Sequence, residues 1–536
     1  MSQPATKSYA SALYSLITVF FFWGFLAASN GVFIPFCKTH FHLTQFESQL
    51  IDFTFYGGYF IGSLILYFIS QLTKVDLLNK IGYKNGIVYG LLISTVGALA
   101  MVPAINNGHF AFILSAFFIV AVGFSLQQTA ANPFVVALGP PETGSDRLNF
   151  AGGVNNFGGL LGPIIVSVVL FGSSQGSSSQ SDVSITSVNN LYFILAGLFL
   201  AVALFYRFSN LPAINSTEKV DASTRANAPL LFITLGFLMI LVANPLEKMT
   251  GLRNAYFIYT ALAIILLSII YVLITPKTNP DSWGAMQYPQ LVLGMLAIFT
   301  YVGVEVTVQS NLGALLKLPA FGAYADSAIK PFISLYWGSL MIGRWTGGIS
   351  AFKLAKSTKN ILTVVVPFVA FGVVLFFNHI SGTDVSNLYG YAVCVTVLIV
   401  AFFLGRNIPT RVLMIFGLLG MFAMIVGLLT TGTIAIYAFL SGGLCCSIMF
   451  PSIFSLAVAG LGKHTSQGSA FLIMMILGGS IIPPVQGILA DTAGIHISYI
   501  IPVICFAYIT FFAIKVGPAL KKQGINMNNV VAGGGH

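Results

Sequence analysis

One carboxylate, Glu305, lies inside a long apolar segment of this 536-residue sequence, in AIFTYVGVEVTVQSNLGALL. In a helix, Tyr301, Glu305 and Gln309 share one face, because they are spaced four residues apart. An acidic side chain at membrane depth is costly unless it is paired or faces water, so it usually marks a functional site. Glu305 is therefore a candidate to carry a proton, bind sodium or accept hydrogen bonds from hydroxyl groups. The alternative is a structural acid that is hydrogen-bonded to a neighbouring helix.

Amide side chains form a second group of polar residues within apolar runs. Gln127, Gln128 and Asn132 lie in SLQQTAANPF. Gln128 and Asn132 are one helical turn apart, and Pro133 leaves the carbonyl of Thr129 without its helical partner. Such a break is tolerated where a neighbouring helix or a cavity satisfies the freed group.

Three more asparagines extend this set: Asn30 in the first apolar run, and Asn155 and Asn156 in GGVNNFGG. Amides both donate and accept hydrogen bonds, which suits a neutral ligand rich in hydroxyl groups. The alternative for each amide is hydrogen bonding between helices, worth about 1 kcal/mol per bond.

Five other charged residues are candidates for coupling or gating. Asp52 lies near the outer start of the second apolar segment, where it either binds a cation or is simply solvated. Arg344 lies near the inner end of its segment, which predicts contacts with carbonyl groups or a carboxylate. Lys74, Asp76 and Lys80 fall in the loop after the second segment, and we expect them to gate that side of the protein.

The composition requires that most of these residues lie in membrane-spanning helices. Hydrophobic residues make up 57% of the chain and charged residues only 7%, whereas a soluble domain has roughly 25% charged residues. The net charge of +10 comes from basic residues in short loops, which indicates membrane topology rather than nucleic-acid binding. The five cysteines show no metal-ligand spacing, and we expect neither a disulfide framework nor a cofactor.

The apolar runs predict an all-α polytopic membrane protein with sixteen spans, although fourteen would also fit the charge pattern. The expected spans are 12–37, 48–71, 83–105, 109–137, 148–172, 190–209, 229–245, 254–275, 288–314, 331–352, 361–378, 387–404, 411–430, 433–459, 468–489 and 497–517. With both termini in the cytoplasm, eighteen basic residues fall on the cytoplasmic side and five on the other. This bias follows the positive-inside rule and supports the orientation.

Two pairs of motifs suggest that the chain repeats itself in the same direction. ANPFVVALG at 131–139 corresponds to FPSIFSLAVAGLG at 450–462, and GGLLGP at 158–163 corresponds to GGSIIPP at 478–484. Repeated halves are typical of secondary transporters, which hold their substrate near the membrane midplane between the halves.

Several motifs together resemble the fucose–proton symporter family of the major facilitator superfamily, which includes bacterial glucose/galactose transporters. The matching stretches keep their order along the chain: WGF…N at 23–30, YGGYFIGS at 56–63, TAANPFVVALG at 129–139, RLNFAGGVNNFGG at 147–159, YVGVEV at 301–306, MIGRWTG at 341–347 and FPSIFSLAVAGLG at 450–462. The resemblance implies two six-helix bundles, alternating access and a monosaccharide moved with an ion.

The chain departs from the family pattern at residues that matter for coupling. The family's helix-1 aspartate is replaced by Gly31, and the fucose symporters' helix-4 glutamate by Gln128, as in the hexose-transporting relatives. Glu305 matches the helix-7 glutamate of those relatives. The helix-5 asparagine matches Asn155, while the family's nearby glutamine is Gly152. Three possibilities therefore remain open: Glu305 has taken over the coupling role, sodium is the coupling ion, or transport is uncoupled.

The resemblance also implies the division of the chain. We expect an N-terminal bundle at 1–210, a cytoplasmic linker with an inserted helix pair at 211–287, a C-terminal bundle at 288–520 with a second pair near 361–404, and a tail at 521–536. We expect a monomeric inner-membrane transporter, not an enzyme, for a neutral sugar such as glucose, galactose or fucose, coupled to H⁺ or Na⁺. A uniporter and a non-transporting sugar sensor are the alternatives.

Overall fold

The computed structural model describes residues 10–40, 45–75, 77–140, 143–171, 185–212, 223–275, 282–324, 326–352, 354–405 and 408–525, and these form helices and short connections without a strand. The α-helices are α1 (Ala10–His40), α2 (Gln45–Thr73), α3 (Leu77–Ile81), α4 (Tyr83–Asn107), α5 (Phe110–Ala137), α6 (Gly144–Phe171), α7 (Ile185–Phe208), α8 (Asn227–Leu241), α9 (Ala243–Thr250), α10 (Asn254–Ile274), α11 (Pro289–Leu316), α12 (Asp326–Gly348), α13 (Lys356–Ile380), α14 (Ala392–Gly405), α15 (Pro409–Leu429), α16 (Gly432–Cys446), α17 (Met449–Val458), α18 (Thr465–Met474), α19 (Gly478–Ala493) and α20 (Ile500–Lys522). The 3-10 helices are η3 (Thr224–Ala226), η5 (Gly284–Gln287), η6 (Pro319–Phe321), η7 (Ile349–Ala351), η8 (Ser386–Tyr391), η9 (Gly462–His464), η10 (Met475–Leu477) and η11 (Ile497–Tyr499).

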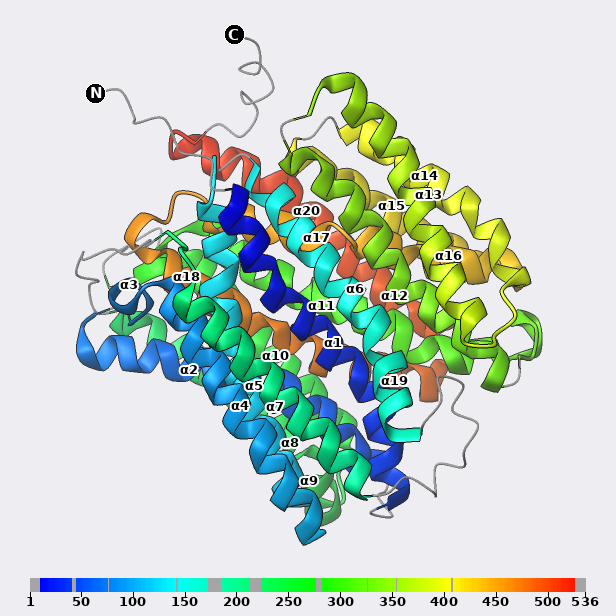
Figure 1. Ribbon diagram of the computed structural model, residues 1–536, viewed down its shortest axis with the longest axis horizontal. Helices are drawn as coiled ribbons and strands as arrows, with labels where there is room; N and C mark the ends of the chain where they lie inside the picture. Colours follow the sequence, from blue (N-terminus) through cyan, green and yellow to red (C-terminus); the bar gives the residue numbers. More distant parts are fainter. Residues whose placement is uncertain are drawn as a thin grey trace.

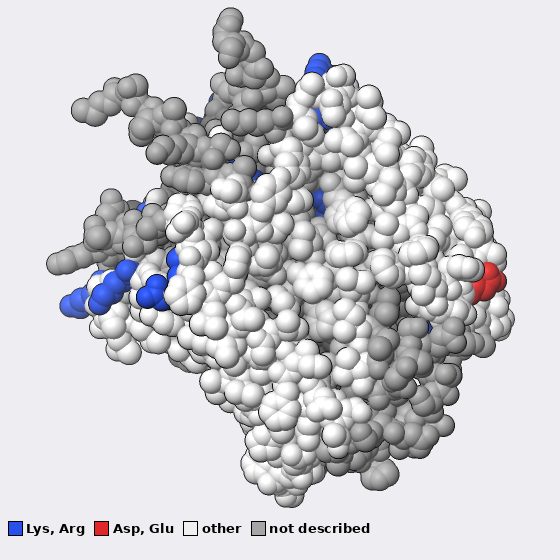
Figure 2. Space-filling model, in the orientation of Figure 1, with Lys and Arg blue, Asp and Glu red and all other residues white. Residues whose placement is uncertain are grey.

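Each of the sixteen expected spans coincides with helix. Within the described residues, 12 helical segments are long and apolar enough to cross a membrane, and two shorter apolar helices cover Ser11–Leu26 and Thr224–Ile240. The remaining two spans correspond to α6 and α12, which carry Asn156 and Arg344. Figure 2 shows a surface that is mostly uncharged, with several basic side chains gathered where α3 lies in Figure 1. We call the end of the molecule that carries α3, the start of α1 and the end of α20 the basic-loop end.

The expected span at 433–459 is broken into two shorter helices near a proline. It divides into α16 and α17, and Pro451 lies in the first turn of α17. Proline has no N–H, so the carbonyl of Ser447 loses its helical donor. The guanidinium of Arg344 donates to that carbonyl instead, with an Nε–O distance of 3.0 Å. The break is therefore satisfied by a side chain of α12.

Pro133 in α5 has the same effect on the carbonyl of Thr129, as the sequence predicts. The hydroxyl of Ser469 on α18 donates to this carbonyl at 2.9 Å. A neighbouring helix thus supplies the missing donor, and the helix continues through Pro133 without ending.

The repeated glycine motifs occupy equivalent places in the structure. A Cβ on Gly158 of α6 would lie 2.2 Å from the carbonyl oxygen of Phe21 on α1, and a Cβ on Gly478 of α19 would lie 1.9 Å from that of Phe299 on α11. Only glycine allows the two backbones to approach so closely. The α1–α6 and α11–α19 crossings therefore match, as a repeat in the same direction requires.

The helices form two groups that meet along two seams. We call α1–α7 the N-terminal half, and α11, α12 and α15–α20 the C-terminal half. One seam is the packing of α6 against α12, and the other is the packing of α2 and α5 against α18, with α2 also touching α19. Residues far apart in the sequence therefore meet in the middle of the molecule (Figure 1).

Two helix pairs lie outside these halves. The pair α13 and α14 packs at the periphery against α12, α15 and α16 (Figure 1). The pair α8 and α10 packs together beside α2, α11 and α19. Phe237 of α8 stacks on Phe53 of α2, with ring centroids 4.8 Å apart. Both pairs are thus built onto the outside of the two-half arrangement.

Candidate functional site

Glu305 is held by Tyr301 on its own helix and by Arg344 on the neighbouring helix α12. The hydroxyl of Tyr301, one turn earlier on α11, donates to Glu305 Oε1 at 2.8 Å. Nη2 of Arg344 on α12 lies 3.6 Å from the same oxygen, and donates to the Tyr301 hydroxyl at 2.9 Å. Because a phenol has only one proton to donate, the Tyr301 hydroxyl links the cation to the carboxylate. The predicted common face of Tyr301 and Glu305 is confirmed.

Arg344 also reaches across the seam to the N-terminal half. Its Nη1 donates to Oδ1 of Asn156 on α6 at 2.8 Å and approaches the carbonyl oxygen of Gly152 at 3.5 Å. The carbonyl of Ser447, freed by Pro451, fixes the other edge of the guanidinium. Arg344 therefore does contact carbonyls and a carboxylate, as predicted. Its position between the halves was not predicted.

Both members of this ion pair are withdrawn from solvent. The side chain of Arg344 is 9% exposed and that of Glu305 is 14% exposed. A buried charge needs its partner, because an unpaired charge in a low-dielectric site is strongly destabilising. Any process that changes the charge on Glu305 must therefore change the interactions of Arg344, and through them the contact with Asn156.

The adjacent glutamines of α5 have different surroundings. Gln127 is fully buried, accepts a hydrogen bond from the indole N–H of Trp23 at 3.0 Å, and donates to the hydroxyl of Ser94 at 3.0 Å. Gln128 is half-buried and donates to the hydroxyl of Tyr59 at 3.1 Å. Gln127 thus positions Trp23, while Gln128 holds Tyr59.

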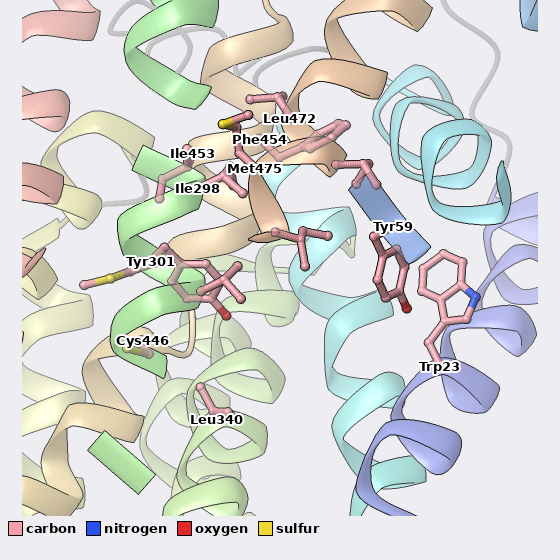
Figure 3. Close-up of a cluster of buried hydrophobic side chains, with 14 of the residues drawn as sticks. Trp23, Tyr59, Ile298, Tyr301, Leu340, Cys446, Ile453, Phe454, Leu472 and Met475 are labelled. Atoms are coloured by element: carbon pink, nitrogen blue, oxygen red, sulfur yellow. The ribbon is translucent and has the colours of Figure 1, made fainter. Parts of the chain in front are cut away.

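Trp23 and Tyr59 lie on the N-terminal side of the molecular centre, and Tyr301 lies across from them with its hydroxyl directed toward that side (Figure 3). Aromatic rings pack well against the apolar faces of ring-shaped ligands, and their polar atoms also offer hydrogen bonds. Trp23 and Tyr59 are not among the candidate residues that the sequence predicted. The motifs WGF and YGGYF contain them, but motifs alone do not show which ring faces the centre.

The predicted asparagines have two kinds of surroundings: one bonds to a neighbouring helix, and two have buried amide atoms that lack a hydrogen-bond partner among the described residues. Asn155 donates to the backbone carbonyl of Phe20 at 3.0 Å, which ties α6 to α1. Asn156 uses its oxygen for Arg344, and its buried Nδ2 has no partner among the described residues. Asn132 is 1% exposed, and neither of its amide atoms has a partner in the described part of the chain. Buried polar groups are normally paired, so among the predicted amides these two have spare bonding capacity.

The structure describes only some of the remaining predicted residues. Gln309 lies one turn beyond Glu305 on α11 and is half-buried. Lys74 and Lys80 are exposed at the basic-loop end. Asp76 and the side chains of Asn30 and Asp52 lie outside the described residues. Among the described residues, no three His, Cys, Asp or Glu side chains converge on a point that could hold a metal ion.

The contacts that close the basic-loop end are neutral and were not predicted. Asn79 of α3 donates to the backbone carbonyl of Lys463 at 3.1 Å and accepts from the hydroxyl of Ser466 at 2.8 Å. Ser469 adds its bond to the carbonyl of Thr129. Short polar residues of this kind are common in loops, so the sequence offers no signal that separates these from their neighbours.

Comparison with known proteins identifies the family. The chain is 30% identical over 508 residues to the glucose/galactose transporter of Brucella abortus, covering 95% of this chain and 94% of the relative. It is 26% identical over 522 residues to the L-fucose-proton symporter of Escherichia coli, covering 95% of this chain and 93% of that one. No family model matches the sequence.

The fold agrees with this relationship. The crystal structure of FucP, a major facilitator superfamily transporter in the outward conformation, superposes with a TM-score of 0.63 at 25% identity, covering 95% of this chain and 99% of that one. A proton:xylose symporter of the same superfamily has the same fold at 15% identity, with a TM-score of 0.52. The chain therefore belongs to the family of glucose/galactose transporters and fucose–proton symporters within the major facilitator superfamily.

Proposed function

We propose that this protein is a secondary active transporter that carries a neutral monosaccharide together with a proton, by alternating access. Its relatives are named as transporters of glucose and galactose and as a symporter of fucose. They are not enzymes, and this chain shares about 95% of its length with them. A hexose is favoured over fucose, because the resemblance associates Gln128 with the hexose carriers.

The observation that carries the coupling proposal is the chain of contacts from Glu305 through Tyr301 and Arg344 to Asn156. Neutralising Glu305 removes the charge partner of Arg344. The guanidinium then shifts its interactions toward Asn156 and the hydroxyl of Tyr301, which alters the seam between α6 and α12. In this way, binding of a proton to Glu305 is coupled to movement of the two halves. Because Gly31 and Gln128 lack the carboxylates of the fucose symporters, Glu305 is the proposed coupling acid.

The proposed sugar site lies between the halves. Trp23 and Tyr59 supply aromatic surface, and Gln128, Asn132 and Asn156 supply amide groups. Glu305 and Gln309 supply acceptors from α11. Asn30 and Asn155 contribute from α1 and α6, and Gln127 acts by fixing the indole of Trp23.

The orientation of the protein in the membrane is proposed from the distribution of its basic residues. With the basic-loop end in the cytoplasm of the inner membrane, both termini are cytoplasmic, and the contacts of Asn79 with Ser466 close the cytoplasmic side. Lys74 and Lys80 belong to the proposed gate at this end, to which Asp76 is assigned from the sequence alone, and Asp52 belongs to the part of α2 at the opposite end. The domain division at 1–210, 211–287, 288–520 and 521–536, and a monomeric state, remain part of this proposal.

The test is uptake of labelled glucose, galactose and fucose into proteoliposomes under separate pH and sodium gradients, with wild type and Glu305→Gln. Accumulation driven by the pH gradient, lost in Glu305→Gln while counterflow of sugar persists, is the expected result. The control is Asp384→Asn in an exposed loop, where hydrogen bonds from the backbone N–H and the hydroxyl of Ser386 hold the pKa of Asp384 below its usual range. This variant should transport normally.

Other outcomes have definite meanings. Driven accumulation that survives in Glu305→Gln contradicts the role of Glu305. Accumulation driven by the sodium gradient would mean that sodium, not the proton, is the coupling ion. If the sugar only equilibrates under both gradients, the protein is a uniporter. Binding without flux indicates a sensor.

A further inference from the structure

The helix pair α8 and α10 bridges the seam between α2 and the α18–α19 segment. Together with α9 and the flanking turns η3 and η5, it forms a unit that we call the seam hairpin (described residues 223–275 and 282–288). Its two ends both return to the basic-loop end of the molecule, because η3 precedes α8 and η5 follows α10. The unit is therefore attached to the rest of the protein at the place where the halves meet.

The long sides of the seam hairpin contact different halves. On α8, Phe237 stacks on Phe53 of the N-terminal half, and the tip of its ring lies over Gly57, whose added Cβ would approach it to 2.8 Å. On α10, Ile258 is buried in one small apolar cluster with Val485 of α19, in the C-terminal half. The hairpin thus lies across the seam rather than on one side of it.

The two ends of the hairpin are bonded to both halves at once. The backbone N–H of Ser223 donates to Gln71 Oε1 at 2.8 Å, and the hydroxyl of Tyr67 lies 3.0 Å from the Ser223 carbonyl oxygen; both partners are on α2. Gln467 of α18 donates to the Ser223 hydroxyl at 3.0 Å and accepts from the N–H of Ala285 at 2.7 Å. Tyr67, Ser223, Ala285 and Gln467 are all buried. Gln467 therefore holds both ends of the hairpin to the C-terminal half, while Tyr67 and Gln71 hold one end to the N-terminal half.

The junction is tightly packed around Gly284. Gly284 has φ of 56°, and a Cβ there would lie 2.0 Å from the Ser223 hydroxyl oxygen and 2.5 Å from Gln467 Oε1. The N–H of Arg225 donates to the carbonyl of Ser282 at 3.2 Å, which joins the two ends directly. Because these hydrogen bonds converge on Ser223 and Gln467, the junction cannot widen there without losing some of them.

We propose that the seam hairpin is a built-in clamp that favours the conformation in which the halves are closed at the basic-loop end. When α2 moves away from α18, Ser223 cannot keep its partners on both helices. Either the bonds of Gln467 or those of Tyr67 and Gln71 must break, and buried polar groups lose their partners. The closed state gains these bonds and the open state does not, so the hairpin shifts the equilibrium toward closure.

This clamp is independent of the transported solute, because it acts on the separation of the halves and not on the site at Glu305. A distance measurement therefore tests it even if the proposed sugar is wrong. Spin labels at Lys80→Cys and Lys521→Cys, both exposed at the basic-loop end on opposite halves, report the separation in nanodiscs. The chain without introduced cysteines controls for labelling of native cysteines.

The decisive variant is Gly284→Ala, whose methyl group disrupts the junction. We expect the ratio of long to short distances to rise about tenfold, as for the loss of two hydrogen bonds of ordinary net strength. The matched control is Gly251→Ala after α9, which has a similar φ of 73° but no atom of a described residue within 4 Å of its added Cβ, and should leave the distances unchanged. Gln467→Ala, which adds no atoms, should shift the ratio in the same direction as Gly284→Ala.

Unchanged distances between the labels in Gln467→Ala would overturn the clamp. This test applies even if Gly284→Ala fails to fold. An equal shift in Gly284→Ala and Gly251→Ala would also overturn it, because the cause would then be backbone strain in general. A shift toward shorter distances would mean that the hairpin favours opening.

Discussion

On one side of the molecule α6 and α12 pack directly against each other, whereas on the other side α2 meets α18 and α19 beside the seam hairpin. The direct seam contains a charged group, Arg344, whose bonds run from Asn156 to Glu305. The covered seam is held by uncharged groups around Ser223 and Gln467. A seam with a buried cation responds to the charge of its neighbours, whereas a seam of neutral hydrogen bonds only sets a constant preference. In the proposed mechanism, the direct seam is the part that responds to ligand and proton, and the covered seam is the part that sets the resting conformation.

The largest expected effect is at the direct seam, in Arg344→Ala. Removing the guanidinium leaves Glu305 without a charge partner and frees the carbonyl of Ser447, which should destabilise the protein by about 3–5 kcal/mol and abolish driven transport. Thermal unfolding in detergent and proteoliposome uptake measure the two effects. Arg411→Ala, at an exposed arginine at the start of α15, is the control and should change neither. Equal melting temperatures for the two variants would contradict the importance of the buried cation.

A second variant tests how tightly the direct seam is packed. A Cβ on Gly153 of α6 would lie 2.6 Å from Cδ1 of Trp345 on α12, and the Trp345 indole donates to the Gly153 carbonyl at 3.2 Å. Gly153→Ala should therefore cost about 1–3 kcal/mol through overpacking. Within the part of the chain that the structure describes, the added Cβ of Gly197→Ala in α7 meets no atom within 4 Å. This variant should be neutral or stabilising, because alanine favours helix. If both variants melt alike, α6 and α12 are not in close contact.

The smallest expected effect concerns the contact of α18 with α5. Ser469→Ala removes the donor to the Thr129 carbonyl and should cost about 1 kcal/mol. Since that bond joins the halves, the loss should appear as a modest increase in the long distance between labels at positions 80 and 521, smaller than in Gly284→Ala. Ser115→Ala, at an exposed serine bonded only within its own helix, is the control. A shift as large as that of Gly284→Ala would place the clamp at Ser469 instead of the seam hairpin.

Local features were predictable from the sequence. Hydropathy located the helices, the four-residue spacing predicted the common face of Tyr301 and Glu305, and proline chemistry predicted the free carbonyl of Thr129. Gln127 and Gln128 could not be distinguished, because neighbours on a helix point about 100° apart and only the packing decides which one is buried.

Contacts between distant segments were not predictable. The bond between Arg344 and Asn156 joins residues 188 positions apart, and the bond between Ser223 and Gln467 joins residues 244 apart. The apolar pattern of α8 and α10 shows that they are membrane helices, but not that they cross a seam. Asp52, Asp76 and Asn30 remain predictions, because their side chains lie outside the described part of the chain.

The two prolines of the repeat have unequal consequences for motion. Arg344 and Ser447 belong to the same half, so the carbonyl freed by Pro451 keeps its donor whichever way the halves tilt. Thr129 and Ser469 belong to opposite halves, so the carbonyl freed by Pro133 loses its donor whenever the basic-loop end opens. A carbonyl exposed in that position needs another partner, such as water. In the proposed alternating-access cycle, each opening would therefore expose one carbonyl in the middle of α5 to hydration, and each closing would return it to Ser469.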